Sequence, residues 1–249
     1  MKSLDKALDI LELFLEADED ISLSDLARMS GLDKSTVNRI TTAFVRRGYL
    51  KQQGKRGKYS LGAKFLDYSG IVKKRIRIRD LAIPHMTKLA ASANESVILA
   101  TLDGQQAVHS ETVHANHPLR IVPDEGTKVP LYCTGVGKIL LAYMAEQGID
   151  SYIESNELKR FTSNTITDPN QLRTHLVTIA KEGIAYDDEE NYVGVRNVAA
   201  PVRDREGKVV ASVGVLGPTV RLTRTRMLEV VPDVKECALK ISRELGFKD

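Results

Sequence analysis

The first thirty residues predict two short helices from the spacing of their apolar positions. Apolar residues recur every three or four positions in the first segment, which predicts an amphipathic helix. Its apolar face carries Leu4, Leu8, Leu11 and Leu15, with Ala7 and Phe14 beside them. Ser22, three residues before Asp25, has the pattern of a helix N-cap, and Gly31 can end the second helix through a positive φ.

A third helix is predicted to begin at Asp33, whose carboxylate can accept the free backbone N–H groups of the first turn. Its apolar face carries Val37, Ile40 and Phe44, and its opposite face is polar. At about 100° per residue, that polar face holds Ser35, Arg39, Thr42 and Arg46, with Asn38 to one side. The pattern predicts a helix-turn-helix over residues 23–42, although a small helical bundle with a polar surface has the same periodicity.

Two short strands, 49–52 and 58–61, follow the third helix and enclose a turn over residues 53–57 that contains two glycines and two cations, Lys55 and Arg56. A basic hairpin in this place is typical of a wing that contacts phosphates or the minor groove. Residues 63–79 then predict a helix. The cations near its end are compatible with simple stabilisation of the helix terminus or with a position near the DNA backbone.

The remaining chain alternates helices with strands joined by tight turns. Asp103 and Gly104 form a hairpin signal, residues 194–202 and 209–216 are strand-like, and Thr223 can cap a last helix that ends near Leu245. Antiparallel hairpins with helices between them predict an α+β domain.

Charge is distributed unevenly along the chain. Residues 33–79 contain 14 Lys and Arg against 2 Asp and Glu, whereas the whole chain has a net charge of only +3. A basic segment between acidic ones indicates a surface for a polyanion, although a solvated basic helix without a partner has the same composition. No apolar run reaches the roughly 18 to 20 residues of a membrane span. Cys133 and Cys237 fit reduced thiols. We therefore expect a cytoplasmic protein with no membrane partner.

Double-stranded DNA is the polyanion that these features favour. Arg and Asn can form paired hydrogen bonds with base edges, and Ser, Thr and Lys can contact phosphates. The candidate DNA-binding residues are Lys34, Ser35, Thr36, Asn38, Arg39, Thr42, Arg46, Lys55, Arg56 and Lys58. One such module contacts few base pairs, so we expect a homodimer on an inverted-repeat operator, formed through the first helix and the linker helix.

Several blocks of the sequence resemble the IclR family of bacterial transcriptional regulators. The DNA-binding blocks are LDKALDILELF, SLSDLARMSGLDKSTVNRI and RRGYLKQQGKRGKYSLGAKFL; the later ones are VPLYCTGVGKILLAYM, GIAYDDEENYVGVRNVAAPV and KVVASVGVLGP. The resemblance implies a winged helix-turn-helix domain over 1–62, a linker helix over 63–79 and a GAF-like effector-binding domain over 80–249. It also implies a homotetramer, formed when the effector domains pair.

A helix start at residues 135–137 is the first candidate ligand site. The segment lacks the spacing of a phosphate-binding loop, but the free N–H groups of Gly135, Val136 and Gly137 would suit a carboxylate. The alternative is that these glycines only allow close packing of the helix on the sheet.

The family resemblance implies the remainder of an effector pocket. Matching block by block, its wall comprises Gly135, Val136, Asp187, Val195, Asn197, Gly214 and Leu216. Asn197 stands where the family often has cysteine, and Gly214 and Leu216 stand where it often has serines. These departures predict a roomier and less polar wall, hence a larger, partly apolar organic acid in preference to a two- or three-carbon oxoacid.

Other chemistry was weighed against this interpretation. His109 and Glu111 would share a strand face and, with His114 and His117, suggest a metal site, but the histidine spacing matches no known ligand set. No catalytic constellation is present, and no cofactor is expected. We expect an effector-responsive repressor of a catabolic operon, although the sign of regulation depends on operator position. The alternatives are a GAF-type small-molecule-binding enzyme with an incidental DNA-binding domain, and a DNA-binding protein without a ligand.

Overall fold

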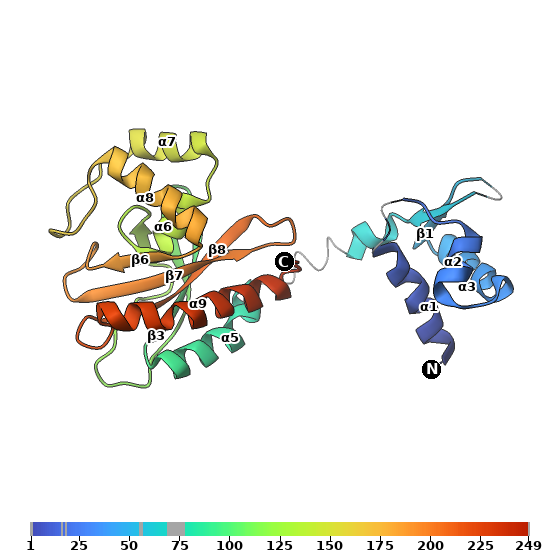
Figure 1. Ribbon diagram of the computed structural model, residues 1–249, viewed down its shortest axis with the longest axis horizontal. Helices are drawn as coiled ribbons and strands as arrows, with labels where there is room; N and C mark the ends of the chain where they lie inside the picture. The colour runs from blue at the N-terminus through green and yellow to red at the C-terminus, as the bar shows by residue number, and fades with distance from the viewer. Residues whose placement is uncertain (1, 16, 18, 55–56, 69–77, 249) are drawn as a thin grey trace. The chain divides into compact units, whose positions relative to one another are not determined.

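The computed structural model describes residues 2–15, 17, 19–54, 57–68 and 78–248. The chain divides into two compact units, Met1–Ile76 and Arg77–Asp249 (Figure 1). The division falls inside the segment predicted as the linker helix. Residues 64–68 of that segment are helical, and residues 69–77, which hold most of its cations, lie outside the described residues. The predicted domain bounds therefore stay a prediction.

The N-terminal unit is a winged helix-turn-helix, as the sequence predicted. Its elements are α1 (Lys2–Glu12), a 3-10 turn η1 (Leu13–Leu15), α2 (Leu23–Ser30), α3 (Lys34–Arg46), β1 (Leu50–Gln52) and β2 (Tyr59–Leu61). The two strands pair antiparallel, with Leu50 opposite Leu61, and Ile21 forms an isolated bridge to Tyr59. This bridge joins the wing to the segment that precedes α2.

The predicted helix caps are confirmed. The Ser22 hydroxyl accepts a hydrogen bond from the backbone N–H of Asp25 at 3.2 Å and donates one to the Asp25 carboxylate at 2.6 Å. Gly31 ends α2 with a φ of +66°, a conformation that costs a residue with a Cβ more than it costs glycine. Asp33 caps α3 and accepts from the backbone N–H of Thr36 at 2.9 Å.

Only part of the predicted apolar face of α1 is buried. Ile10 and Phe14 are buried in the core of the unit, whereas Leu4, Leu8 and Leu15 are 63%, 48% and 62% exposed. The reason is that α2, α3 and the wing together cover only the Ile10 side of the helix. The predicted leucine stripe is therefore an apolar surface, which we call the α1 leucine stripe (Leu4, Leu8 and Leu15).

The C-terminal unit contains one six-stranded antiparallel sheet, which confirms the α+β prediction. The strands are β3 (Ser96–Asp103), β4 (Gln106–Val113), β5 (Lys128–Pro130), β6 (Ala185–Asp188), β7 (Val195–Arg203) and β8 (Val209–Pro218), in the order β5-β4-β3-β8-β7-β6. The helices are α5 (Ile78–Ala93), α6 (Gly135–Ala142), α7 (Glu146–Ser155), α8 (Pro169–Glu182) and α9 (Arg224–Glu244). Thr223 caps α9, as predicted, by accepting from the backbone N–H of Arg226.

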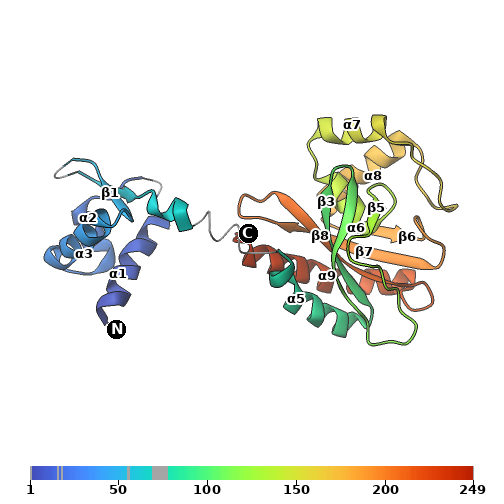
Figure 2. The same ribbon diagram turned by 180° about the vertical axis from the view of Figure 1, so that it is seen from behind.

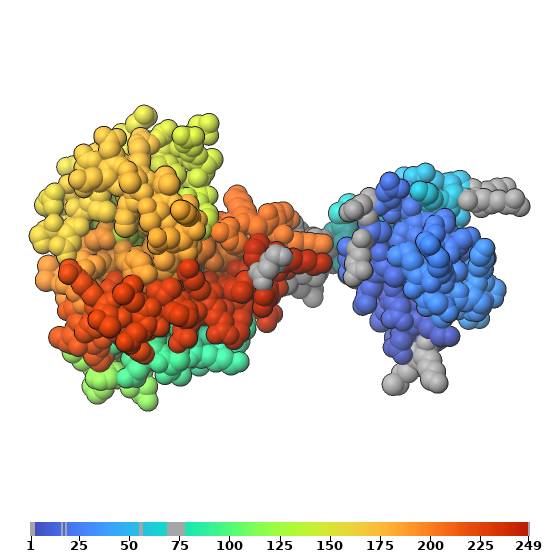
Figure 3. All heavy atoms as spheres, in the orientation of Figure 1, coloured from blue at the N-terminus to red at the C-terminus, as the bar shows by residue number. Residues whose placement is uncertain are grey.

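Helices cover both faces of this sheet. Figures 1 and 2 show α5 and α9 side by side on one face and α6, α7 and α8 on the other. Figure 3 shows the outer sides of α9 and α5 along one side of the unit. The two faces have separate cores, one around Met86 and Val230 and one around Ile139 and Leu172. None of the described helices combines the length and apolar character that a membrane span requires.

A β-bulge in β4 changes which side chains share a face. Leu99 pairs with Glu111 and Ala100 pairs with His109, so Ser110 is an extra residue between the two pairs. Leu99 belongs to the α5 and α9 core and Ala100 to the α6 core. Since directly paired residues point to the same side of a sheet, Glu111 and His109 face opposite layers.

Candidate functional site

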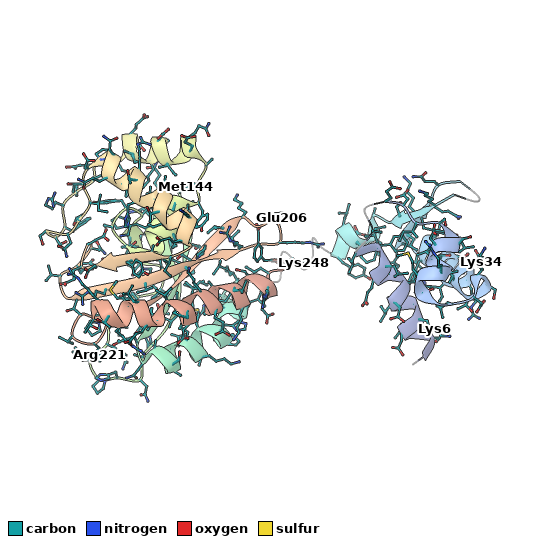
Figure 4. All side chains as sticks on the ribbon, in the orientation of Figure 1. Lys6, Lys34, Met144, Glu206, Arg221 and Lys248 are labelled. Carbon is teal, nitrogen blue, oxygen red and sulfur yellow. The ribbon has the colours of Figure 1, made fainter. Side chains whose placement is uncertain are left out.

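One continuous polar surface covers the outer side of α3. Its six exposed residues are Lys34, Ser35, Asn38, Arg39, Thr42 and Arg46, and Thr36 is half-buried. Figure 4 shows Lys34, in the first turn of α3, on the outside of the unit. Val37 is buried on the opposite side of the helix, and Ile40 and Phe44 pack against the core there. The structure therefore brings the predicted α3 residues together on one surface.

The Asp33 carboxylate organises the first turn of this surface. The hydroxyl of Ser35 donates to it at 2.6 Å and that of Thr36 donates at 2.7 Å. These hydrogen bonds, with the Ser35 bond the largest cause, hold the pKa of Asp33 well below its usual range. With their protons directed to Asp33, the two hydroxyls present lone pairs outward. The donors left on this surface are therefore Lys34, Asn38, Arg39, Thr42 and Arg46.

The wing places one predicted cation beside the acidic segment before α2. Lys58 is exposed, and its Nζ lies 3.6 Å from the Glu19 carboxylate, with both side chains more than half exposed. Such a pair contributes little in water, about 0 to 1 kcal/mol, so it does not prevent Lys58 from turning to a phosphate. The other two predicted wing cations, Lys55 and Arg56, lie outside the described residues.

A cavity of about 290 Å³ lies in the C-terminal unit between the sheet and the start of α6. Its wall is formed by Ile98, His109, Ile121, Val122, Pro123, Asp124, Thr127, Val129, Thr134, Val136, Asp187, Asn191, Tyr192, Val195, Asn197 and Leu216. Five of the predicted effector residues are among them, namely Val136, Asp187, Val195, Asn197 and Leu216. Gly135, Gly137 and Gly214 are not.

The three glycines lie behind the wall, where backbones pack closely. A Cβ on Gly135 would come within 2.2 Å of the Asn197 side-chain oxygen, and one on Gly137 within 2.4 Å of the Thr134 hydroxyl. A Cβ on Gly214 would meet the Val198 carbonyl oxygen at 2.7 Å. These distances support the close-packing explanation of the glycines, so a large side chain at position 214 would disturb β7 and not simply fill the cavity.

Two of the N–H groups predicted to hold a carboxylate are already bonded within the protein. The backbone N–H of Val136 donates to the Asn197 Oδ1 at 3.0 Å, and that of Gly137 donates to the Thr134 hydroxyl at 3.1 Å. Asn197 in turn donates through Nδ2 to the Val215 carbonyl at 2.7 Å. Asn197 therefore fastens α6 to β8, so both ends of its side-chain amide are bonded within the protein.

Part of the cavity wall could not be predicted from the spacing of apolar residues in the sequence. The loop after β4 contributes Ile121, Val122, Pro123, Asp124 and Thr127, and its residues show neither helical nor strand spacing. Asn191 and Tyr192 belong to a block of the family resemblance but were not assigned to the pocket. These residues reach the cavity through chain topology, which a local pattern does not encode.

The predicted sharing of a strand face by His109 and Glu111 is wrong, because the bulge at Ser110 separates them. His109 is buried and lines the cavity, whereas Glu111 is ion-paired with Arg79 on the other side of the sheet. His114, in the following loop, is exposed and His117 half-buried. Among the described residues, no group of three or more metal-binding side chains is assembled.

Arg79 thus has a different environment from the one expected for the linker cations. It lies in the first turn of α5, where its guanidinium contacts the Glu111 carboxylate and lies 3.3 Å from the Glu125 carboxylate. Glu125 belongs to the loop whose neighbouring residues Asp124 and Thr127 line the cavity. Arg79 therefore joins the first turn of α5 to the loop that forms part of the cavity wall, but it does not line the cavity itself.

A buried ion pair lies beside the cavity and was not predicted. Lys138, fully buried on α6, contacts the Glu190 carboxylate, whose Oε2 finds no further partner among the described residues. Burial raises the pKa of Asp187 to about 7, although Lys138 opposes this, and Asp187 accepts from the Glu190 N–H at 2.7 Å. Burial, with a smaller effect of Lys138, lowers the pKa of His175 to about 4.

Two family models together match most of the chain. Residues 3–54 match the IclR helix-turn-helix domain, and residues 71–243 match the C-terminal domain of the bacterial transcriptional regulator IclR. The chain is 31% identical over 248 residues to the HTH-type transcriptional regulator KipR of Bacillus subtilis, covering 99% of this chain and 98% of the relative.

Solved structures agree with this assignment. The crystal structure of Thermotoga maritima IclR has 33% sequence identity, a TM-score of 0.66 and coverage of 99% of this chain and 100% of that chain. An IclR homologue from Microbacterium hydrocarbonoxydans, complexed with 4-hydroxybenzoate, shares the fold with 24% identity, a TM-score of 0.63 and coverage of 98% of both chains. The chain therefore belongs to the IclR family of bacterial transcriptional regulators, which are not enzymes and which join a DNA-binding domain to a C-terminal effector-binding domain.

Proposed function

We propose that this protein represses a catabolic operon as a homodimer, or a pair of dimers, on an inverted-repeat operator, and that an organic acid controls it from the cavity. A dimer bound to DNA excludes other proteins from the same stretch, which is the simplest route to repression. The α1 leucine stripe supports the dimer, because its exposed leucines, two on α1 and one on the adjoining turn η1, form an apolar surface that a second copy would cover.

The cavity is the observation that carries the proposed ligand class. Its centre is apolar, with Ile98, Val129 and Leu216, while polar groups stand at two ends. Asp187 on β6 marks one end and His109 on β4 the other, and three strands lie between β4 and β6 in the sheet. A two- or three-carbon acid would leave much of this cavity of about 290 Å³ unfilled and would not cover its apolar centre. A partly apolar acid with a second polar group fits better.

Arg79 supports a route from this cavity to the DNA-binding unit. It joins the cavity loop, through Glu125, to the first turn of α5, and α5 follows the segment that connects the two units. A ligand that moves the loop would change the start of α5 and thereby favour one spacing of the two recognition helices. Allosteric coupling of this kind is typically worth about 1 to 3 kcal/mol, or roughly 5- to 150-fold in operator affinity.

The test uses operator DNA identified by mapping bound fragments across the genome. Fluorescence anisotropy of the full chain on that DNA is measured with and without a panel of acids: glyoxylate, pyruvate, hexanoate, benzoate, 4-hydroxybenzoate and 4-hydroxyphenylacetate. We expect one of the four larger acids to weaken operator binding by at least about fivefold. A transcription reporter with the same DNA gives the sign of regulation.

A matched pair of variants locates the ligand. Val195→Phe extends a side chain from the cavity wall, whereas Val193→Phe enlarges a side chain that is 78% exposed nearby in the sequence. Both variants should bind the operator, and only Val195→Phe should lose the effector response. An unchanged response in Val195→Phe places the ligand elsewhere, and activation in the reporter would contradict repression.

A further inference from the structure

The charges that line the cavity do not suit an anion, with one exception. Among the described residues of its wall, the titratable side chains are Asp124, Asp187, Tyr192 and His109, and none is Lys or Arg. The backbone N–H groups of Val136 and Gly137 are already bonded to side chains of the protein. A carboxylate placed at the α6 end would also lie near the buried Asp187, a like charge when ionised.

His109 is the one group of the wall that can carry a positive charge. Its side chain is only 6% exposed, and its Nδ1 is buried with no hydrogen-bond partner among the described residues. Its backbone is fixed at both sides, since its N–H donates to the Thr127 carbonyl at 3.0 Å and its carbonyl accepts from Gly126 at 2.8 Å. A buried polar ring without a partner is costly, so the site is incomplete without a ligand.

We propose that His109 binds the anionic group of the ligand, and that the ligand therefore lies with its carboxylate toward β4 and its second polar group toward Asp187. This orientation rests on the proposed function and reverses the one that the residues 135–137 suggested from sequence. It makes His109 a specificity-determining residue that selects acids over neutral molecules of the same shape.

The surroundings of His109 determine its protonation. In the empty cavity, burial lowers the pKa of His109, so the ring is neutral at pH 7.5. The charged groups on the elements around it are paired with each other or lie at the surface: Arg79 with Glu111 and Glu125, Lys128 with Asp103 at 2.8 Å, and Asp124 exposed at the loop. A carboxylate beside the ring would favour imidazolium, and the proton would come from solvent.

Isothermal titration calorimetry of the full chain tests this inference. The probes are 4-hydroxybenzoate, or whichever acid of the panel binds most tightly, and the corresponding neutral amide. His109→Gln retains a hydrogen-bonding group but cannot carry a positive charge, and His114→Gln changes an exposed histidine of the following loop. Titrations in phosphate and in Tris, which differ in ionisation enthalpy, measure the protons taken up on binding.

We expect the wild type to prefer the acid over the amide, and His109→Gln to weaken acid binding by at least about tenfold, the effect of one lost hydrogen bond to a charged group. Amide binding should change little, and His114→Gln should behave as wild type. Proton uptake at pH 7.5 should be lost in His109→Gln and retained in His114→Gln. Undiminished acid binding or proton uptake in His109→Gln overturns the role of His109 alone. A wild type that binds no acid of the panel overturns both this inference and the proposed ligand class.

Discussion

The DNA-binding surface and the ligand cavity are built in opposite ways. The polar surface of α3 comes from thirteen consecutive residues, Lys34–Arg46, and most of its polar side chains are exposed. The cavity wall comes from all six strands of the sheet, from the start of α6 and from loops, spread over residues 98–216, and much of it is buried. The first can be constructed from helical periodicity alone, whereas the second depends on which distant segments meet. This difference explains why the sequence placed the α3 residues on one surface but identified only five residues of the cavity wall.

The two units also use charge differently. The described ion pairs of the N-terminal unit, such as Arg28 with Asp25, join exposed side chains. In the C-terminal unit, Lys138 and Glu190 form a pair with almost no exposed surface. Exposed pairs contribute about 0 to 1 kcal/mol, whereas loss of one partner of a buried pair costs about 3 to 5 kcal/mol. Loss of a charge from the buried Lys138 pair should therefore destabilise the effector domain, whereas loss of a charge from the exposed pairs of the DNA-binding domain should spare its fold.

The largest effect is expected from Lys138→Met. This variant leaves the Glu190 carboxylate buried without its counterion, so the effector domain should lose about 3 to 5 kcal/mol of unfolding free energy. Lys240→Met is the matched control, because it breaks an exposed pair with Glu236 on α9 and should cost less than about 1 kcal/mol. Urea unfolding of both variants gives the comparison. Equal losses would mean that burial of the Lys138 pair has no energetic consequence.

The next effect concerns the pH dependence of stability. Burial raises the pKa of Asp187 to about 7 in the folded protein, so between about pH 4 and 7 the folded state holds a proton that the unfolded state has lost. Stability should therefore fall as pH rises through this window. Each pKa unit corresponds to about 1.4 kcal/mol, and even half of this shift gives roughly 2 kcal/mol.

Asp187→Asn tests this sign. The variant should be more stable than wild type at pH 8 and should lose the Asp187 contribution to the slope between pH 5 and 7. Differential scanning calorimetry across that range measures both quantities. A wild-type stability that rises toward pH 7 by the same amount as in the variant would show that Asp187 ionises at its ordinary pKa.

An effect of comparable size, on DNA binding and not on stability, is expected from a substitution in α3. Arg39→Ala should reduce discrimination at one base pair by about 1 to 3 kcal/mol if Arg39 contacts a base edge. Lys58→Ala in the wing should instead weaken binding to all sequences and reduce the salt dependence. Arg226→Ala, on α9 of the other unit, is the control and should change neither. Equal losses with equal salt dependence in the first two variants would contradict this division of roles.

The smallest effect is expected from Arg79→Gln, which removes the contacts to Glu111 and Glu125 but no part of the cavity wall. Ligand affinity should stay near the wild-type value, while the change in operator affinity caused by ligand should shrink by about 1 kcal/mol. Lys128→Gln, which breaks an exposed pair at the edge of the same sheet, serves as control. Calorimetry and operator anisotropy measured on the same samples separate binding from coupling. Full coupling in Arg79→Gln would exclude this route.

The predictions that the structure confirms are those that depend on contacts between residues close in sequence. Ser22, Asp33 and Thr223 cap their helices through hydrogen bonds within three residues, and Gly31 adopts the positive φ that its place required. These features depend only on neighbours in sequence. Helical spacing also located the α3 surface. Spacing did not show which apolar residues of this segment the rest of the unit covers: Ile10 and Phe14 are buried, whereas Leu4, Leu8 and Leu15 stay exposed.

Features that depend on distant residues could not be predicted in the same way. The Lys138 and Glu190 pair joins positions 52 residues apart, and Asn197 bonds Val136 across 61 residues. The family resemblance named five residues of the wall because it carries information about the folded chain. It did not name His109, whose position in the cavity depends on the register of β3 and β4.

The bulge at Ser110 acts on β4 as a frameshift acts on a coding sequence. Before it, the odd-numbered residues Ala107 and His109 belong to the cavity side; after it, the odd-numbered Glu111 and Val113 belong to the other side. Deletion of Ser110 would leave His109 and Glu111 adjacent and therefore still on opposite sides, whereas a regular strand that kept Ser110 without the bulge would bring the Glu111 carboxylate to the side of His109. Because of the bulge, β4 presents His109 to the cavity and Glu111, two residues later, to Arg79 of α5 on the other side of the sheet. Loss of the bulge, and not loss of the residue, would therefore exchange the sides on which Glu111 and Val113 lie.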